Sequence, residues 1–598
     1  MNKPRNMLLV YPEVPRNTYW SFQYALRFTG KRSSMPPLGL ATVAALFPPG
    51  VRLKLIDLNI EPLLDQDIQW ADTVFISAMI VQKTSFQNVV TRCKDLDKTV
   101  VAGGPYPTSS FQEIDGVDHF VLGEVEDFFH MFFEDFKAGS AGRVCQARQR
   151  PDISCTVGPR FDLLDMSSYA CMAVQYSRGC PYRCEFCDIW QVYGTRPRLK
   201  SSAAILKELT SIYRLGWRGP LFIVDDNFIG NKQQVKRELL PALRDWQVDH
   251  GYPFRFFTEA SVNMADDLQL LAGMRDCGFD AVFIGIETPS LAALRETGKI
   301  QNLKADMPQA VRRIQSFGIE VMAGFIMGFD SDSPEIADRQ IAFIQQTGIP
   351  QAMVGLLTAL PGTQLFKRLQ KENRLMATTD GNNTHCLTTN FKTRLNADIL
   401  KESYKKVLST IYDSNLKNYF GRCNVMLDNL GSTAHQGHGV SLSEIRMLWK
   451  SLKRQPFTTY GFQYLKFLVH NLVKKTGRFP DAVKLAIVGH HFHTITQAML
   501  KRERVMALMD ERYQDLQRCL QHYTASAQDN YWEALQNVID LWHQKGVALK
   551  LIRKKIDRLH VDFRDDMREK YGEVADRMRE LFEAFENELV RNGIRPGP

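Results

Sequence analysis

Short apolar runs alternate with helix-like stretches along the first part of the chain. Up to residue 145, five of these runs have the length and composition of buried strands. A helical pattern extends from Pro37 to Leu46 between the first two runs. Strands separated by helices at such distances predict a doubly wound parallel sheet. The predicted strands are residues 7–11, 51–60, 73–80, 99–102 and 119–122.

The same alternation resumes after residue 171 with six further strand-like runs. Six parallel strands with helices between them predict a partial βα barrel, because a closed barrel of this type has eight strands. The predicted strands are residues 172–176, 221–224, 254–257, 281–286, 321–326 and 352–357.

Helical periodicity dominates from residue 397 to the end of the sequence. Residues 400–419 and 553–591 carry apolar side chains at i, i+3 and i+4 spacing, and we interpret the second stretch as a solvent-facing helical hairpin. The pattern divides the chain into a sheet domain, a linker, a barrel and a helical C-terminal region. These four parts are residues 1–145, 146–170, 171–399 and 400–598.

Composition narrows the class of protein further. Of the 598 residues, 44% are hydrophobic and 24% are charged, which excludes a disordered or low-complexity chain. The sequence contains no run of 18 apolar residues and begins without a signal-peptide pattern, so we expect a cytoplasmic protein. In such a protein, the 11 cysteines favour metal binding or redox chemistry over disulfide bonds.

Three of these cysteines stand close together after the first predicted barrel strand. Cys180, Cys184 and Cys187 form a C-x3-C-x2-C motif in one short segment. Three thiolates on a tight loop can bind three irons of a 4Fe–4S cluster and leave one iron open. Zinc would need a fourth ligand, and neither Cys nor His lies nearby in the sequence. The alternative is that the three cysteines are simply small buried residues.

Polar residues and glycines follow the predicted strands of both sheets. In the barrel, polar side chains follow four successive strands. A single acid at such a position is usually a helix cap. Polar residues at four strand ends beside the cysteine loop favour a functional site. In the first sheet, paired glycines would let a large ligand approach the backbone, or they make only tight turns. The residues concerned are Asp225, Asp226, Asn227, Glu259, Ser261, Glu287 and Gly324 through Asp330 in the barrel, and Ser77, Gly103, Gly104, Pro105, Gly123 and Glu124 in the first sheet.

The cysteine motif, with Phe186 before its last cysteine, resembles that of radical S-adenosylmethionine (SAM) enzymes. The preceding sheet resembles the cobalamin-binding domain of the cobalamin-dependent branch of that family. The resemblance covers about residues 5–400 and is closest at residues 179–193, 224–230, 258–263 and 285–289. These four sequence segments are similar to those of the hopanoid methylases and their relatives, a group with a C-terminal domain of unassigned role.

The resemblance implies a role for each matching residue. The three cysteines would hold the cluster, whose open iron would chelate the amino and carboxylate groups of SAM. Residues expected near SAM are Phe186, Asp225, Asp226, Asn227, Glu259, Ser261, Glu287, Gly324, Ile326 and Gly328. Residues expected near cobalamin are Leu38, Gly39, Ser77, Gly103, Gly104, Pro105, Gly123 and Glu124.

Two departures from the family pattern stand out. Asp225, Asp226 and Asn227 occupy the place of a Gly-Gly-Glu motif that contacts the methionine amino group in many relatives. The D-x-H-x-x-G motif that supplies a lower axial ligand in many cobalamin proteins is absent, and residues 12–15 hold no histidine. Some related radical enzymes bind cobalamin without that histidine, whereas others keep the domain as a scaffold.

The resemblance also implies a reaction. Reduction of the cluster by flavodoxin or ferredoxin would cleave SAM to methionine and a 5′-deoxyadenosyl radical, which would remove hydrogen from an unactivated carbon. Methylcobalamin would then methylate that carbon of a lipid-like or other apolar metabolite, such as a hopanoid. The alternatives are radical C–C coupling or cyclisation without methyl transfer, and a non-catalytic cobalamin or cluster sensor.

One segment of the C-terminal region is unusually basic. Residues 445–480 contain eight Lys or Arg and no acidic residue, interleaved with aromatic residues, within a chain whose formal charge is +9. Such a surface could rest on anionic lipid headgroups at the inner face of the membrane. It could also bind nucleic acid, which we consider unlikely, or be an ordinary helical domain with solvated lysines. Farther along, His490 and His493 could share a helix face, but they lack partners at ligand spacing, which favours a structural role.

Overall fold

The computed structural model describes residues 5–154, 156–377, 379–434, 442–521 and 580. The chain divides into two compact units, residues 1–496 and 497–598, and the features below belong to the first unit, except for the last part of the helix Phe479–Gln521. The predicted hairpin at residues 553–591 lies outside the described residues, apart from Glu580. Among the described residues, no helix is both long and apolar enough to cross a membrane.

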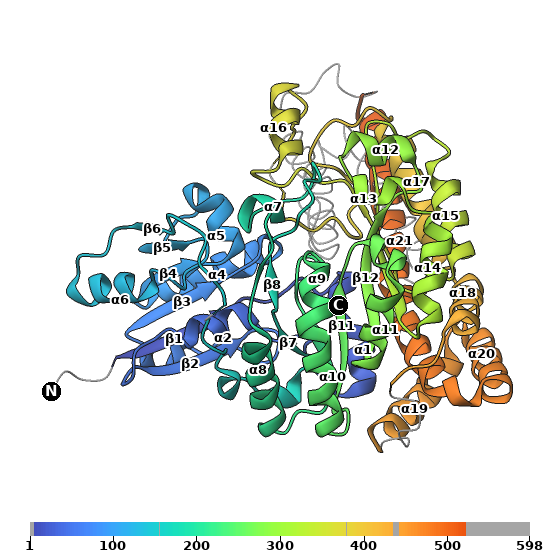
Figure 1. The fold of residues 1–598 in the computed structure, drawn as a ribbon. Helices are drawn as coiled ribbons and strands as arrows, with labels where there is room; N and C mark the ends of the chain where they lie inside the picture. The colour runs from blue at the N-terminus through green and yellow to red at the C-terminus, as the bar shows by residue number, and fades with distance from the viewer. Residues whose placement is uncertain (1–4, 155, 378, 435–441, 522–579, 581–598) are drawn as a thin grey trace. The chain divides into compact units, whose positions relative to one another are not determined.

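The first sheet has six parallel strands in the order β2-β1-β3-β4-β5-β6. Helices cover its two faces, as Figure 1 shows, so it is a doubly wound sheet whose order reverses between β1 and β3. Its strands are β1 (Asn6–Tyr11), β2 (Arg52–Asp57), β3 (Thr73–Ser77), β4 (Thr99–Gly103), β5 (His119–Leu122) and β6 (Val144–Gln146). Its helices are α2 (Leu38–Ala44), α3 (Asp65–Trp70), α4 (Lys83–Asp95), α5 (Pro105–Ser110) and α6 (Phe129–Ala138).

Each of the five strands predicted for this sheet corresponds to one of its strands. The second strand ends earlier than predicted, because Asp57 accepts hydrogen bonds from Asn59 and the backbone turns there. The sixth strand, β6, crosses the predicted boundary at residue 145, where its three residues were too few to produce a pattern.

The second sheet also has six parallel strands, in the order β14-β13-β12-β11-β10-β7. It matches the predicted partial barrel strand for strand, and a short antiparallel hairpin, β8 (Ser177–Arg178) with β9 (Arg198–Leu199), brackets the cysteine loop. Its strands are β7 (Met172–Val174), β10 (Gly219–Ile223), β11 (Phe254–Glu259), β12 (Phe279–Glu287), β13 (Glu320–Met327) and β14 (Ala352–Leu356). Its helices are α7 (Ile189–Val192), α8 (Ser202–Arg214), α9 (Lys232–Gln234), α10 (Leu240–Asp249), α11 (Leu268–Asp276), α12 (Leu291–Glu296), α13 (Ile300–Leu303), α14 (Met307–Ser316), α15 (Ile336–Thr347) and α16 (Gln364–Lys371).

The segment between the two sheets is packed rather than extended. Tyr169 is fully buried, and its hydroxyl donates to Asp57 Oδ2 at 3.0 Å at the end of β2. The backbone N–H groups of Arg32 and Ser33 donate to Ser168 O. The predicted linker therefore holds the first sheet against the residues that lead into the barrel.

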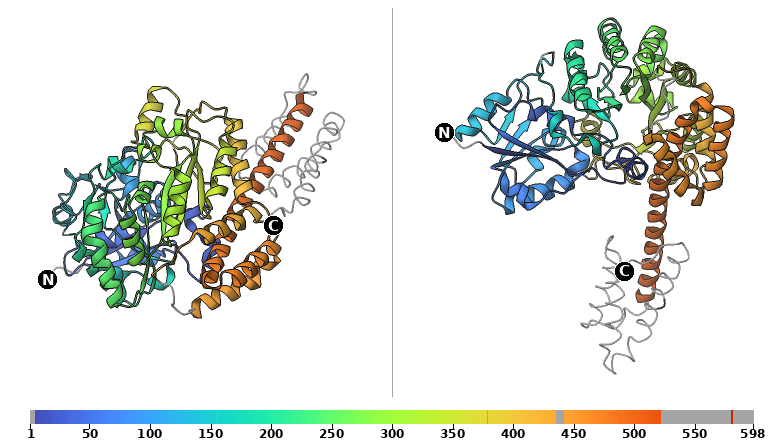
Figure 2. Two further views of the ribbon diagram at one scale, coloured as in Figure 1. Left: turned by 45° about the vertical axis from the view of Figure 1, so that its right-hand side comes forward. Right: turned by 90° about the horizontal axis from the view of Figure 1, so that it is seen from below.

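The described part of the C-terminal region up to residue 521 is helical, as predicted, and its helices α17 and α18 pack beside the barrel helices α14 and α15 (Figures 1 and 2). One helix was predicted over residues 400–419, but the structure has two, because the backbone turns at Asp413 and Leu416 adopts a φ of 53°. The helices are α17 (Ala397–Ile411), α18 (Lys417–Asn429), α19 (Leu442–Arg454), α20 (Gly461–Lys474) and α21 (Phe479–Gln521).

The histidines of α21 bind other parts of the first unit. Fully buried His491 hydrogen-bonds through Nε2 to the carbonyl of Tyr19, near the short helix α1 (Gln23–Thr29), at 3.1 Å. His490 Nδ1 hydrogen-bonds to the hydroxyl of Tyr460, and His493 Nε2 to the carbonyl of Ser414. These contacts give the histidines a packing role.

Candidate active site at the carboxyl edge of the barrel

The three predicted cluster ligands share one loop between β8 and α7. Cys184 is buried and Cys180 and Cys187 are half-buried, and burial raises the pKa of all three thiols. Gly179 begins the loop at a φ of 98°, where a side chain would meet the carbonyls of Gly194 and Tyr193. The loop can therefore close tightly only with glycine at this position.

Two aspartates that follow β10, buried Asp225 and partly buried Asp226, hold the start of this loop. Asp225 accepts hydrogen bonds from Tyr176 N at 2.7 Å and from Ser177 Oγ at 2.6 Å. Asp226 accepts from Gly179 N at 2.8 Å. Burial raises the pKa of Asp225 to about 7 and that of Asp226 to about 6. Both were predicted near SAM, which stays a prediction, and the hydrogen bonds show that they also position the cysteine loop.

A second chain of hydrogen bonds links the loop to the end of β11. Asn227 Nδ2 donates to Ser261 Oγ at 3.2 Å, and Ser261 Oγ donates to Asn263 Oδ1 at 2.8 Å. Asn263 Nδ2 in turn donates to the hydroxyl of Tyr182, which lies between the first two cysteines. The structure thus brings two predicted residues, Asn227 and Ser261, together and connects them to the loop.

Glu287 ends β12 and forms a buried ion pair with a lysine that the sequence did not indicate. Lys299 Nζ lies 2.6 Å from Glu287 Oε1, and the two side chains are 13% and 9% exposed. Glu287 adopts a φ of 66°, and a Cβ at Gly285 would clash with both charged groups, so glycine there makes room for the pair.

Lys299 is also the cation beside the cysteine loop. Its Nζ lies 5.9 Å from the centre of the Phe186 ring. Burial acts to lower the pKa of Lys299, but Glu287 and the thiolates of Cys184 and Cys187 outweigh that effect and keep the pKa well above the ordinary value. The amide of Gln301, from α13, donates to Cys184 Sγ at 3.8 Å. Lys299 and Gln301 therefore offset part of the effect of burial, which raises the pKa of these thiols.

The remaining residues predicted near SAM lie along the same edge. Burial raises the pKa of Glu259, at the end of β11, to about 7. Gly324 and Ile326 are half-buried on β13, and Gly328 follows that strand. Asp332 accepts hydrogen bonds from Gly328 N at 2.8 Å and Phe329 N at 3.1 Å, which fixes the turn after β13.

Lys299, Gln301 and Asp332 were missed by the sequence analysis. Lys299 and Gln301 lie beyond β12 in the turn after α12 and at the start of α13, so neither periodicity nor position at a strand end marks them. Asp332 is two residues beyond the predicted stretch from Gly324 to Asp330, and only its contact with the turn distinguishes it from a solvated acid.

The first sheet meets this site through a cluster of charges. Glu124, predicted near cobalamin, is 8% exposed and pairs with Arg178 at 2.8 Å and Arg198 at 2.5 Å. Glu126 pairs with Arg178 at 2.6 Å. Because Arg178 and Arg198 belong to the hairpin that brackets the cysteine loop, these acids fasten the carboxyl edge of the first sheet to the barrel.

The other residues predicted near cobalamin fall into two groups. A Cβ at Gly103 would meet Val121 O at 2.9 Å, and one at Gly104 would meet Ser77 Oγ at 2.6 Å, so the chain itself fills these positions. A Cβ at Gly39 would meet no atom within 4 Å. The remaining residues lie at the start of α2, the end of β3 and the start of α5. These are Leu38, Gly39, Ser77 and Pro105, whereas Gly123, with a φ of 80°, makes the turn after β5.

The cysteine loop fits an iron–sulfur cluster better than a single ion. Within the part of the chain that the structure describes, no three His, Cys, Asp or Glu side chains converge at the spacing of one metal ion. Thiolates that each bind a different iron of a cluster stand farther apart than the ligands of one ion. A parallel barrel with a three-thiol loop and buried polar groups at its carboxyl edge is the arrangement expected of an enzyme that uses an iron–sulfur cluster, with the three cysteines as its predicted ligands.

Comparison with known proteins identifies the family. Residues 174–339 match the radical SAM superfamily, and residues 363–504 match a domain of unknown function, DUF4070. The chain is 44% identical over 409 residues to an uncharacterised methyltransferase of Synechocystis, covering 68% of this chain and 76% of the relative. It is 32% identical over 496 residues to the hopanoid C-2 methylase of Rhodopseudomonas palustris, covering 81% and 93%. The chain belongs to the radical SAM superfamily, in the group of methyltransferases that these relatives represent.

Two solved structures share the fold. The radical SAM methyltransferase TsrM from Kitasatospora setae, solved with cobalamin and a 4Fe–4S cluster, matches with a TM-score of 0.54 at 14% identity over 81% of this chain and 99% of that chain. The cobalamin-dependent radical enzyme OxsB, solved with aqua-cobalamin and SAM, matches with a TM-score of 0.54 at 16% identity over 90% and 84%. They confirm the predicted fold class: a mixed α/β chain with parallel sheets and a helical C-terminal region.

Proposed function

We propose that this enzyme is a cobalamin-dependent radical SAM C-methyltransferase that acts on an unactivated carbon of a lipid-like or other apolar metabolite. The observation that carries the proposal is the cysteine loop, which Asp225 and Asp226 hold at the barrel edge beside the Glu287–Lys299 pair. The name of the Rhodopseudomonas relative, a hopanoid C-2 methylase, supports the methyl transfer and the apolar substrate.

The proposal assigns the cofactors to different parts of the chain. Cys180, Cys184 and Cys187 would hold the 4Fe–4S cluster, and cobalamin would lie at the carboxyl edge of the first sheet, where a Cβ at Gly39 would meet no atom within 4 Å. When bound, these groups and SAM supply the radical that removes hydrogen and the methyl group that replaces it. The protein orients them, and the buried polar edge of the barrel keeps water away from the reactive carbon.

Isotope transfer tests the proposed reaction. The protein is reconstituted with iron, sulfide and cobalamin, reduced with dithionite, and incubated with methyl-deuterated SAM and a lipid extract from the producing cells. We expect 5′-deoxyadenosine, a corrinoid absorption band that survives gel filtration, and a lipid product that carries deuterium. The Cys184→Ala variant serves as the control and should yield none of the labelled product.

The outcomes separate methylation from its alternatives. 5′-Deoxyadenosine with a ring closure or a new C–C bond, and no labelled methyl group, would replace methylation with radical coupling. A lack of 5′-deoxyadenosine in a fully reconstituted protein would leave only the non-catalytic sensor.

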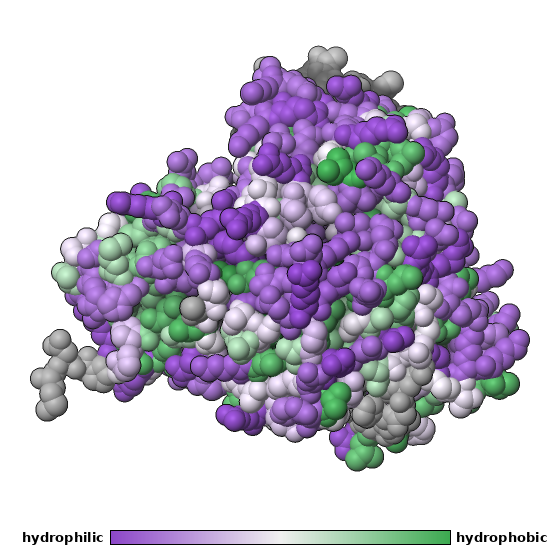
Figure 3. All heavy atoms as spheres, viewed as in Figure 1, coloured by the Kyte–Doolittle hydropathy of each residue, from purple (hydrophilic) through white to green (hydrophobic). Residues whose placement is uncertain are grey.

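We also infer that residues 445–480 contact the inner face of the membrane. In support, α19, α20 and the turn between them expose apolar side chains: Trp449 is 60% exposed, Phe457 85% and Phe462 77%. Figure 3 shows hydrophobic residues at the lower edge and at the right-hand edge, where Figure 1 places α19 and α20. Exposed apolar side chains amid eight basic and no acidic residues suit an anionic bilayer surface.

Vesicle flotation at low salt tests this contact. The protein should float with vesicles that contain phosphatidylglycerol and remain below with neutral phosphatidylcholine vesicles. Replacing Phe462 and Val473, which is 75% exposed, by Ser should reduce the bound fraction severalfold, whereas replacing the exposed Leu291 and Val248 of the barrel helices should not. Equal behaviour with both vesicle types would contradict the inference.

A further inference from the structure

Helix α16 covers the outside of the cysteine loop. Leu365 N donates to the carbonyl of Glu185 at 3.0 Å, directly after Cys184 in the chain. The buried side chains of Leu365 and Leu369 pack in the apolar cluster against which Phe186 also packs. Helix α16 therefore packs directly against the cysteine loop at Glu185 and Phe186.

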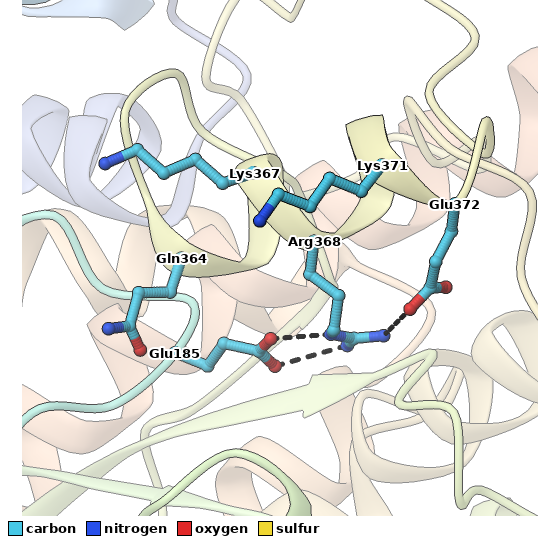
Figure 4. Close-up of a pocket in the computed structure, with 6 residues that line it drawn as sticks. All are labelled: Glu185, Gln364, Lys367, Arg368, Lys371 and Glu372. Atoms are coloured by element: carbon cyan, nitrogen blue, oxygen red, sulfur yellow. Dashed lines mark hydrogen bonds and ion pairs between the residues drawn. The ribbon is translucent and has the colours of Figure 1, made fainter.

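An ion-pair network locks this helix to the loop. Arg368 Nε lies 2.6 Å from Glu185 Oε1 and its Nη2 lies 3.2 Å from Oε2, so the pairing is bidentate. Arg368 also contacts Asp330 at 2.9 Å, which Arg374 binds in turn. These contacts cancel the charges of Arg368 and Glu185 and fix the position of α16 (Figure 4).

The outer side of α16 keeps two lysines that the network does not use. Lys367 and Lys371 are exposed, and within the described residues no acidic group lies at ion-pair distance from either amine. Both border a hollow of about 440 Å³ that reaches Glu185 of the loop, and Figure 4 shows their side chains extending to the same side. We call this pair of lysines with the hollow the α16 face.

We propose that the α16 face is the docking surface of an acidic electron-transfer protein of the flavodoxin class that reduces the cluster. The inference rests on the proposed function, because only a redox-active cluster needs such a donor. One electron leaves the reduced donor and enters the cluster, so the donor is oxidised and the cluster reduced. Unpaired lysines on a rigid helix attract an acidic partner and raise its rate of association, and the place where they hold it adjoins the cluster loop.

Charge reversal with two electron sources tests the proposal. The K367E/K371E variant and the wild type are compared for 5′-deoxyadenosine formation with flavodoxin kept reduced by its NADPH-dependent reductase, and with dithionite. We expect the KM for flavodoxin to rise at least tenfold at low salt and the difference to shrink at high salt, because salt screens the attraction. The rate with dithionite should stay within about twofold of the wild type, because this small reductant needs no docking surface.

A matched variant controls for the change in charge. Lys207 and Lys417 are exposed on α8 and α18, so K207E/K417E carries the same four-unit change without touching the α16 face. This variant should keep the wild-type KM for flavodoxin. An equal rise in KM in both double variants would show that only the overall charge matters and would overturn the proposal.

The two reductants distinguish failure of the docking surface from failure of the proposed function. If dithionite supports activity and flavodoxin acts equally well on K367E/K371E, the docking proposal is wrong and the proposed function stands. If the variant loses activity equally with both reductants, the lysines serve the substrate or the fold, and the docking proposal is again wrong. A wild type that makes no 5′-deoxyadenosine with dithionite refutes the proposed function itself.

Discussion

The two parallel sheets carry predicted cofactor residues at their carboxyl edges, but the two edges are built differently. At the barrel edge, Asp225, Asn227 and Ser261 form hydrogen bonds that converge on the cysteine loop. At the edge of the first sheet, neighbouring atoms of the chain already fill the space where a side chain at Gly103 or Gly104 would lie. Glu124 forms ion pairs with two arginines. The polar side chains at the strand ends of the barrel therefore form a hydrogen-bonded network, whereas the paired glycines of the first sheet mainly form turns.

Removing a cysteine tests the barrel edge most severely. Cys184→Ala should abolish the iron–sulfur absorption and the cleavage of SAM, because two thiolates cannot hold the cluster. Cobalamin binding, measured by the corrinoid band after gel filtration, should remain within about twofold if the two edges work independently. Loss of cobalamin together with the cluster would show that the edges form a single site.

Lys299→Met tests whether the buried ion pair matters beyond the fold. The change leaves the Glu287 carboxylate buried without its cation, a loss that typically costs about 3–5 kcal/mol. We expect the rate of SAM cleavage to fall about 100-fold while the cluster content stays the same. A change of about 100-fold corresponds to a loss of about 2.7 kcal/mol in transition-state stabilisation. Methionine at this position is similar in length to lysine but uncharged.

The double variant Glu287→Gln with Lys299→Met is the companion to this test, since it removes both charges. Recovery of stability without recovery of activity would assign the pair a direct role at the site. Recovery of both would contradict that role and make the pair purely structural.

Gly39→Trp tests the open part of the first sheet. A Cβ at Gly39 would meet no protein atom within 4 Å, so a bulky side chain can begin there, and we expect an indole to obstruct a bound corrinoid. We expect the dissociation constant of cobalamin to rise about tenfold, equivalent to about 1.4 kcal/mol, in an absorbance titration. Gly421→Trp, at a position on α18 that is also open, is the matched control and should bind as the wild type does. Unchanged affinity in Gly39→Trp would place the corrinoid elsewhere.

The strands and the helical region could be predicted because burial imposes a regular pattern on the sequence. All eleven predicted strands of the two sheets are present, and only β6, with three residues, was too short to see. The three cysteines predicted as cluster ligands could be proposed from the sequence because their spacing is local. Lys299 and Arg368 were not, because Lys299 pairs with a residue 12 positions away and Arg368 with one 183 positions away. Contacts of that kind depend on how the chain folds back, which spacing does not reveal.

The last expected effect is the pH dependence of the cysteine loop, which Asp225 should control. Burial raises the pKa of Asp225 from an ordinary 3.8 to about 7, so the folded state binds a proton more tightly than the unfolded state does. The resulting stabilisation is fully present below the ordinary pKa and is lost as the pH rises through about 7. Between pH 5 and pH 8 the loss should amount to about 2–3 kcal/mol.

Hydrogen exchange at the amide of Tyr176, which donates to Asp225, reports the opening of this segment. After correction for the intrinsic exchange rate, the opening free energy should fall over this pH range in the wild type and fall less in Asp225→Asn, in which Asp226 is left as the titrating aspartate of the pair. At the first sheet, Asp57 provides the comparison, since burial also raises its pKa. Asp57→Asn should leave the pH profile at Tyr176 unchanged. A profile that Asp57→Asn flattened as well would mean that the two edges open together, and the difference between them would then not extend to their stability.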